Sequence, residues 1–193
     1  LKKIQNVFLH CFYKSEKTEL LFEKLASNKK IDFSRYNYFY AVYLSNLGEV
    51  DKAKKIVNSS LELYPRNLLL HQFKLDTNDY KYESNFNCLN LSHIAAEILY
   101  ITANALSSQN IYKFSNFYLN LSKYLNKEFG SFDTLLAENF YKKDNFIKAK
   151  EIYNEVAKKG KIFHWYAAKQ NAKIFLLEEK SEKALKTLSN AYE

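Results

Sequence analysis

The sequence predicts an all-α fold built as an array of antiparallel helix pairs, and three observations support this. The chain of 193 residues holds only three Gly and one Pro, so most of it can run in long regular elements joined by short polar turns. Aromatic side chains are abundant, with 16 Tyr and 15 Phe that can fill the space between packed helices. Small residues also recur in pairs at a fixed spacing, as repeated helix pairs require.

The paired small residues set the register of four predicted helix pairs. The members of each pair stand twelve residues apart, and they are Ala41 with Ala53, Ala103 with Ser115, Ala137 with Ala149, and Ala172 with Ala184. A small side chain on each helix lets the two backbones approach closely, while large apolar residues one turn away seal the contact. The first members of the last three pairs follow at intervals of 34 and 35, but an interval of 62 separates the first two. The longer interval indicates an insertion.

A polar turn lies between the two members of each pair. The four turns are Asn46-Leu47-Gly48-Glu49, 107–110, 142–145 and 178–181. Each is typical of a short connection between antiparallel helices.

The clearest stretch, 38–53 with the later Ser60 and Pro65, resembles the tetratricopeptide repeat family. Its matching residues stand where the family has its small, apolar, turn and helix-ending residues: Ala41, Leu44, Gly48, Ala53, Ser60 and Pro65. The stretch 136–153 resembles the same pattern with Asp144 at the turn and no closing Pro, and 103–122 and 172–191 are weaker matches. The order of the segments is also similar to large repeat proteins of alphaproteobacteria. The resemblance implies a right-handed α-solenoid, a TPR-like superhelix.

We therefore expect residues 1–193 to form a single array. Its parts are a degenerate leading helix pair at 1–30, a repeat at 34–65, a partial repeat with a loop insertion at 66–91, and repeats at 92–127, 130–160 and 162–193. A helix is expected at 68–75, followed by a polar loop at 76–90, for which a surface insertion is favoured over a segment that grips a partner. The last residues still have a helical pattern, so the array is expected to be cut from a longer chain.

Composition limits the partners and leaves the compartment open. The net charge is +8, but the Lys residues are interleaved with Asp and Glu, and no basic stripe or nucleic-acid module is visible. Nucleic acid is therefore a disfavoured partner. No apolar run reaches the length of a membrane span, so a soluble protein is expected. The resemblance to repeat proteins of alphaproteobacteria implies a location in the bacterial cytoplasm or periplasm. Cys11 and Cys88 each stand alone and are predicted to be buried thiols, although a disulfide between them stays open.

The sequence shows no pattern of a catalytic, cofactor-binding or metal site. No metal-ligand spacing surrounds the four His residues, and the three Gly residues are too far apart for a phosphate loop. No GxSxG elbow occurs. We therefore expect the chain to be no enzyme and to use no cofactor.

The resemblance implies that the first helix of each pair lines a concave groove. The candidate groove residues are Arg35, Tyr38, Tyr100, Asn104, Glu138, Tyr141, Tyr166, Lys169 and Lys173. The Tyr residues are possible anchors or possible filling of the groove, and the two Lys residues could receive a carboxylate but are more typical of a solvated face. The expected function is a non-catalytic protein–protein interaction scaffold that binds a peptide or partner helix. A structural array that packs against its own longer chain or a larger complex is the alternative, and a nucleic-acid binder is less favoured.

Overall fold

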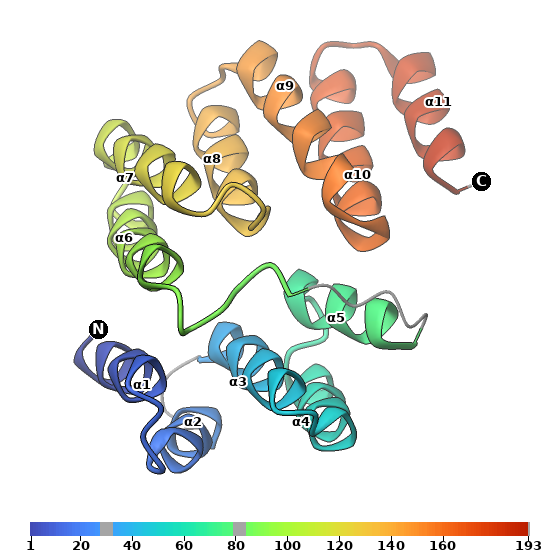
Figure 1. The fold of residues 1–193 in the computed structure, drawn as a ribbon. Helices are drawn as coiled ribbons and strands as arrows, with labels where there is room; N and C mark the ends of the chain where they lie inside the picture. Colours follow the sequence, from blue (N-terminus) through green and yellow to red (C-terminus); the bar gives the residue numbers. More distant parts are fainter. Residues whose placement is uncertain (28–32, 79–83, 193) are drawn as a thin grey trace. The chain divides into compact units, whose positions relative to one another are not determined.

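A computed structural model describes residues 1–27, 33–78 and 84–192 and shows helices without β-strands in these ranges (Figure 1). The prediction of an all-α fold is confirmed. The helices are α1 (Lys2–Phe12), α2 (Thr18–Ala26), α3 (Ser34–Asn46), α4 (Val50–Leu63), α5 (Leu68–Asn78), α6 (Leu91–Ser108), α7 (Tyr112–Leu125), α8 (Ser131–Tyr141), α9 (Phe146–Val156), α10 (Lys161–Leu177) and α11 (Ser181–Tyr192).

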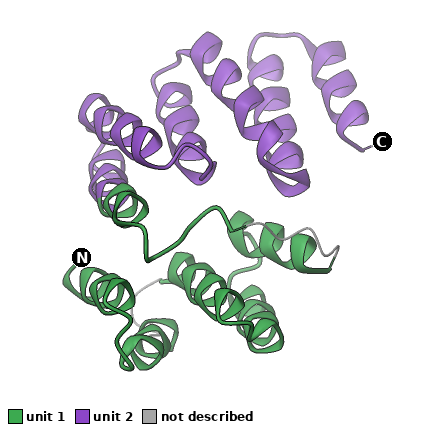
Figure 2. Cartoon of the chain, in the orientation of Figure 1, with its two compact units in different colours: residues 1–98 green, residues 99–193 purple. Residues whose placement is uncertain are grey.

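The chain divides into two compact units, 1–98 and 99–193, where the sequence predicts a single array (Figure 2). The boundary falls within α6. In the first unit α1 packs on α2, α2 on α3, α3 on α4, and α5 on both α3 and α4. In the second unit α8 packs on α7 and α9, and α10 packs on α9 and α11. The first helices α3, α8 and α10 thus each contact their own second helix and the second helix of the preceding pair.

Four helix pairs close with the same turn. The backbone adopts a positive φ seven residues after the first small residue of each pair, at Gly48 (84°), Asn110 (62°), Asp144 (56°) and Glu179 (59°). The next amide then donates to a carbonyl five residues back, as Glu49 N does to Leu44 O at 2.9 Å and Asn145 N to Phe140 O at 3.0 Å. This bond satisfies a carbonyl at the helix end. Asn and Asp tolerate a positive φ better than most side chains, so two of the three turns without Gly keep this geometry at low cost.

The small residues that set the register lie inside the helix pairs. All eight are buried, with at most 3% of their surface exposed. In the pair α6–α7 the contact is direct, because the Ser115 hydroxyl donates to the Ala103 carbonyl at 2.8 Å. Small side chains therefore occupy the positions of closest approach between the two helices.

Replacing one of these small residues by a large one should open a helix pair. Ala149 is fully buried, so the Ala149→Phe variant should lose about 1–3 kcal/mol of unfolding free energy through overpacking. Urea denaturation followed by circular dichroism measures this loss. Ile147→Phe on the same helix is the control and should change little, since Ile147 is 74% exposed. An unchanged urea midpoint for Ala149→Phe would contradict the placement of Ala149 between two packed helices.

The helix of the partial repeat is longer than the sequence predicts: α5 continues to Asn78 instead of ending at residue 75. Two bonds support its last turn: Gln72 Nε2 donates to Asp76 Oδ1 at 2.7 Å, and the Thr77 hydroxyl donates to Phe73 O at 2.8 Å. Thr77 is therefore part of a buried helix end and not of a polar loop. Residues 79–83 of the predicted loop, 28–30 of the leading pair and residue 193 lie outside the described residues.

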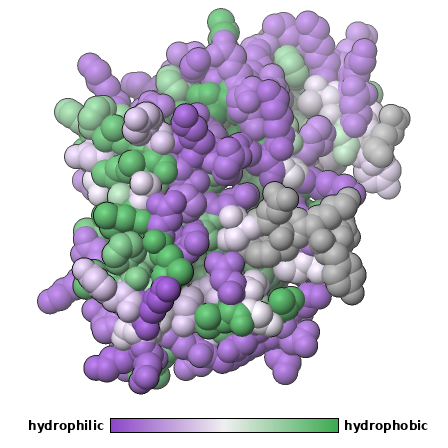
Figure 3. All heavy atoms as spheres, in the orientation of Figure 1, coloured by the Kyte–Doolittle hydropathy of each residue, from purple (hydrophilic) through white to green (hydrophobic). Residues whose placement is uncertain are grey.

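The face drawn in Figure 3 is largely polar, and apolar side chains gather on the side where α6 and α7 lie. Within the described ranges, none of the helices is sufficiently long and apolar to cross a lipid bilayer.

Candidate functional site

The candidate site belongs to the second unit, where three successive first helices are joined through side chains. The Ser107 hydroxyl of α6 donates to Asn139 Oδ1 of α8 at 2.6 Å, and the Tyr166 hydroxyl of α10 donates to Glu138 Oε1 of α8 at 2.6 Å. The ring of Tyr100 also lies 5.6 Å from that of Phe132. These contacts place α8 between α6 and α10. We use the name first-helix face for eight of the exposed or half-buried side chains of these helices: Tyr100, Asn104, Glu138, Tyr141, Trp165, Tyr166, Lys169 and Lys173.

A buried hydrogen-bond network holds the α6–α7 pair against α8. Asn139 Nδ2 donates to Ser115 Oγ and to Asn116 Oδ1, both at 2.8 Å. Asn139 is fully buried, and Ser115 is itself one of the small residues that set the register. Buried polar groups that are fully paired favour one packing arrangement over its alternatives. The network therefore fixes how successive helix pairs are placed beneath the first-helix face.

The exposed part of the first-helix face is aromatic and basic. Asn104, Lys169 and Lys173 are exposed, whereas Tyr100 and Tyr141 are half-buried. Trp165 is 38% exposed, and Lys169 Nζ lies 5.8 Å from the centre of its ring. The sequence reasoning missed Trp165, although it is the only Trp of the chain and stands one helical turn before Lys169. An exposed Trp beside a cation is a typical anchor of binding sites.

Two predicted groove residues, Glu138 and Tyr166, form a hydrogen bond with each other. Burial and the adjacent Glu138 carboxylate raise the pKa of Tyr166 far above its usual value. The Tyr166 hydroxyl therefore stays protonated at neutral pH and donates its hydrogen bond to the Glu138 carboxylate. The bond joins α8 to α10 and leaves the Glu138 carboxylate charged, while Lys169 and Lys173 of α10 are exposed.

Of the two groove residues predicted in the first unit, Tyr38 is buried and Arg35 is half-buried and paired. Arg35 Nε and Nη2 donate to Glu97 Oε1 and Oε2, each at 2.7 Å, and Glu97 is fully buried. Tyr38 is 6% exposed and packs with its ring 5.5 Å from Phe39 and 6.1 Å from Phe73. Neither side chain is presented to a partner, because the ion pair and the aromatic core of the first unit occupy them. The sequence pattern identified their helix but could not reveal these long-range contacts.

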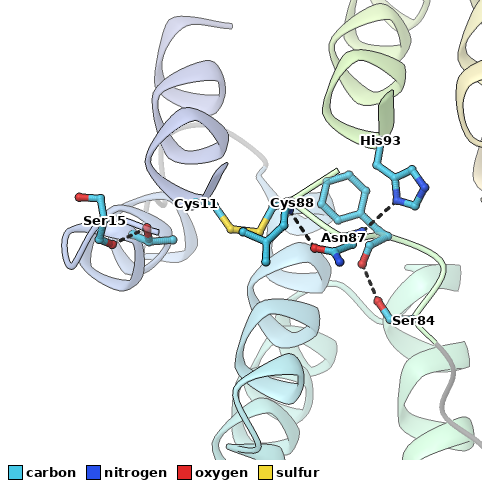
Figure 4. Close-up of a disulfide and its surroundings, with 9 residues drawn as sticks. Cys11, Ser15, Ser84, Asn87, Cys88 and His93 are labelled. Atoms are coloured by element: carbon cyan, nitrogen blue, oxygen red, sulfur yellow. Dashed lines mark hydrogen bonds between the residues drawn. A yellow bond between two sulfur atoms is a disulfide. The ribbon is translucent and has the colours of Figure 1, made fainter. Parts of the chain in front are cut away.

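Cys11 and Cys88 form a disulfide and are not the thiols that the sequence favoured (Figure 4). Their Cα atoms are 5.8 Å apart although 77 residues separate them in sequence. The bond joins α1 to the segment 84–90. His93 supports this segment, since its Nδ1 accepts a bond from Asn87 N at 3.0 Å and burial lowers the pKa of the imidazole.

The segment 84–90 is a loop with exposed Ser and Asn side chains, as predicted, but its Phe86 and Cys88 side chains are buried in the core of the first unit. Phe86 is 2% exposed, with its ring 5.4 Å from Phe8 and 4.4 Å from Phe39. The sequence reasoning read the surrounding Ser and Asn residues as a polar loop and overlooked this aromatic residue. Phe86 and Cys88 stand two residues apart between polar neighbours. This alternation could have indicated that the two side chains are buried.

In the described part of the chain, the structure gathers no group of three or more His, Cys, Asp or Glu side chains that could hold a metal ion. No protein-family model matches the chain, and a comparison with curated proteins finds no significant relative.

Proposed function

We propose that the chain is a non-catalytic interaction module that binds an extended peptide or partner helix across the first-helix face of its second unit. The observation that carries this proposal is the side-chain linkage of α6, α8 and α10, three neighbouring helices that carry the aromatic and Lys side chains of the first-helix face. A rigid scaffold that presents exposed Trp and Lys side chains suits recognition more than reaction chemistry.

The resemblance to tetratricopeptide repeats supports the same proposal. The four pairs share one turn geometry, their small residues are buried, and α8 and α10 each contact a second helix on both sides. A right-handed solenoid built in this way presents its first helices on a concave side. The solenoid and its groove are part of the proposal.

The charge on α10 indicates the chemistry of the partner. Lys169 and Lys173 are exposed one helical turn apart, and Trp165 lies one turn before Lys169. This arrangement fits a segment that places an apolar side chain on the indole and a carboxylate beside the two ammonium groups.

A peptide-display selection against the immobilised chain tests the proposal. Each recovered peptide is titrated against the wild type, against Lys169→Ala/Lys173→Ala, and against Trp165→Ala. We expect affinity to fall about tenfold or more in both variants, as for anchor residues of an interface. Lys183→Ala/Lys186→Ala on α11 removes the same charge from exposed positions and should bind as the wild type does.

Two results would contradict the proposal. The first is a selection that returns no binding peptide. The second is a set of peptides that bind the α10 variants and the α11 control with equal affinity. Circular dichroism verifies that the variants keep the helical content of the wild type, since all the replaced side chains are exposed.

A further inference from the structure

A pocket of about 310 Å³ lies in the first unit and is lined by α2, α3 and α4. Ile56 and Leu63 of α4 give it an apolar wall, and Asn37 and Tyr40 line it from α3. Among the described residues of the lining, Glu23 of α2 is the only charged one. Concave sites with apolar walls and few polar groups are typical of small-molecule binding. We call this site the α2–α4 pocket.

The α2–α4 pocket contains a buried acceptor without a donor. Asn37 is 4% exposed, and its Oδ1 has no hydrogen-bond partner within the ranges that the structure describes. A buried carbonyl oxygen without a donor costs free energy, so such groups are nearly always paired in folded proteins. A ligand that brings an N–H donor into the pocket removes this cost.

The second unit contains a pocket at the equivalent place. It has a volume of about 430 Å³ and is lined by α7, α8 and α9. Counted from the small residues that set the register, Tyr40 is equivalent to Leu136 and Ile56 is equivalent to Ile152. Leu136 and Ile152 line the second pocket as Tyr40 and Ile56 line the first. The two pockets are therefore the same feature of the repeated helix pairs.

In the second unit, an ammonium group of the chain itself reaches the residue equivalent to Asn37. That residue is Asp133, which also stands four positions before its small residue and is buried. Lys123 of α7 lines the second pocket, and its Nζ lies 2.5 Å from Asp133 Oδ1. In the first unit the preceding second helix, α2, lines the pocket with Ala26 and Ser27. Small side chains thus stand where the second unit has a lysine.

The α2–α4 pocket has a negative potential at the end that Tyr40 lines. The Tyr40 hydroxyl donates to Glu23 Oε1 at 3.3 Å. Burial raises the pKa of Tyr40, and the charges of Glu23 and Glu49 raise it further. Carboxylates that raise the pKa of a phenol also favour a cation at the same place.

The neighbouring cations do not cancel this potential. Lys52 pairs with Glu19 and lies 3.5 Å from Glu49, so one ammonium group serves two carboxylates. Lys24 and Lys55 are exposed and adjacent in sequence to lining residues, but they project about 100° away around their helices and do not line the pocket. Glu23 is therefore the charge that an occupant of the pocket meets.

We propose that the α2–α4 pocket binds a small alkylammonium ion. Its hydrocarbon chain lies against Ile56 and Leu63, and its ammonium group donates to Asn37 Oδ1 near the Glu23 carboxylate. The ligand supplies to the first unit what the Lys123 side chain supplies to the second. The site lies in the first unit and does not depend on the first-helix face.

Three small probes of one length test the proposal on the isotope-labelled full chain. n-Butylammonium reproduces a Lys side chain, 1-butanol keeps the chain without the charge, and butanoate reverses the charge. Amide chemical shifts, including the side-chain amide of Asn37, follow each titration. We expect n-butylammonium to saturate the pocket with about fivefold higher affinity than 1-butanol at low salt, and butanoate to bind more weakly than either.

Variants of the pocket assign the site. Ala26→Lys should place an ammonium group in the pocket, as Lys123 does in the second unit, and should abolish binding of n-butylammonium. Ala26→Ser is its matched control and should bind as the wild type does. Glu23→Gln should weaken binding about fivefold and remove the preference over 1-butanol. Glu16→Gln removes the same charge from an exposed position off the pocket and should leave binding unchanged.

Four outcomes would overturn the proposal. They are no saturable binding of n-butylammonium, equal affinity for the three probes, unchanged binding by Ala26→Lys, and unchanged binding by Glu23→Gln. Circular dichroism verifies that both variants keep the helical content of the wild type. A short Lys-containing peptide that binds while n-butylammonium does not would assign the pocket to a protein side chain and would also overturn the proposal.

Discussion

Replacing Cys88 by Ser should lower the unfolding free energy of the first unit by about 4 kcal/mol. The disulfide closes a loop between positions 77 residues apart, and a crosslink of that span removes much of the conformational freedom of the unfolded chain. The loss should be large because the bond also holds Phe86 in the core between Phe8 and Phe39. Urea unfolding followed by circular dichroism measures it.

Trp165 provides an internal control for the disulfide experiment. It is the only Trp of the chain and lies in the second unit, so its fluorescence reports that unit alone. In Cys88→Ser the circular dichroism transition should begin at lower urea, while the Trp165 fluorescence midpoint should stay near that of the wild type. Wild-type protein treated with a reductant should behave as Cys88→Ser does. An unchanged circular dichroism transition in both samples would show that the bond contributes no stability.

The Arg35→Ala variant should lose about 3–5 kcal/mol, because it leaves the Glu97 carboxylate buried without its cation. Burial raises the pKa of Glu97 above its usual value, and Arg35 opposes that rise. Removing Arg35 should therefore raise the pKa of Glu97 further. A buried acid with a raised pKa binds its proton more tightly in the folded state than in the unfolded state.

The sign of the pH dependence follows from this difference. Stability should fall as the pH rises from the unfolded pKa of Glu97 to its folded pKa, so Arg35→Ala should be more stable near pH 5 than at pH 7 relative to the wild type. Arg35→Ala/Glu97→Gln should recover stability at pH 7 and lose this excess dependence. Urea unfolding at the two pH values measures both effects. A loss in Arg35→Ala that is the same at both pH values would contradict the assignment to the Glu97 charge.

The helices could be predicted from the sequence because local rules determine them. Spacing of the small residues placed four helix pairs, and the turn at Asp144 was located despite the absence of Gly. Long-range contacts could not be predicted in this way. Nothing near Arg35 in the sequence indicates Glu97, and nothing near Cys11 indicates Cys88, because those contacts exist only after the first unit has folded.

Only part of the candidate site could be predicted, because contacts between helices are not visible in the sequence. The resemblance to tetratricopeptide repeats selected Asn104, Lys169 and Lys173, and these side chains are exposed in the structure. The bond between Tyr166 and Glu138 joins two helices, so a pattern within one helix could not predict that the two residues satisfy each other. The importance of Trp165 depends on its exposure, which spacing alone did not determine.

The most direct test of the central claim is an amide chemical-shift titration of the isotope-labelled chain with a peptide recovered by display. Binding across α6, α8 and α10 predicts that the largest shifts occur around Asn104, Trp165, Lys169 and Lys173, with little change along α9 and α11. Shifts concentrated on the second helices, or distributed over both units without a maximum on α10, would contradict the proposal that the first-helix face is the binding site.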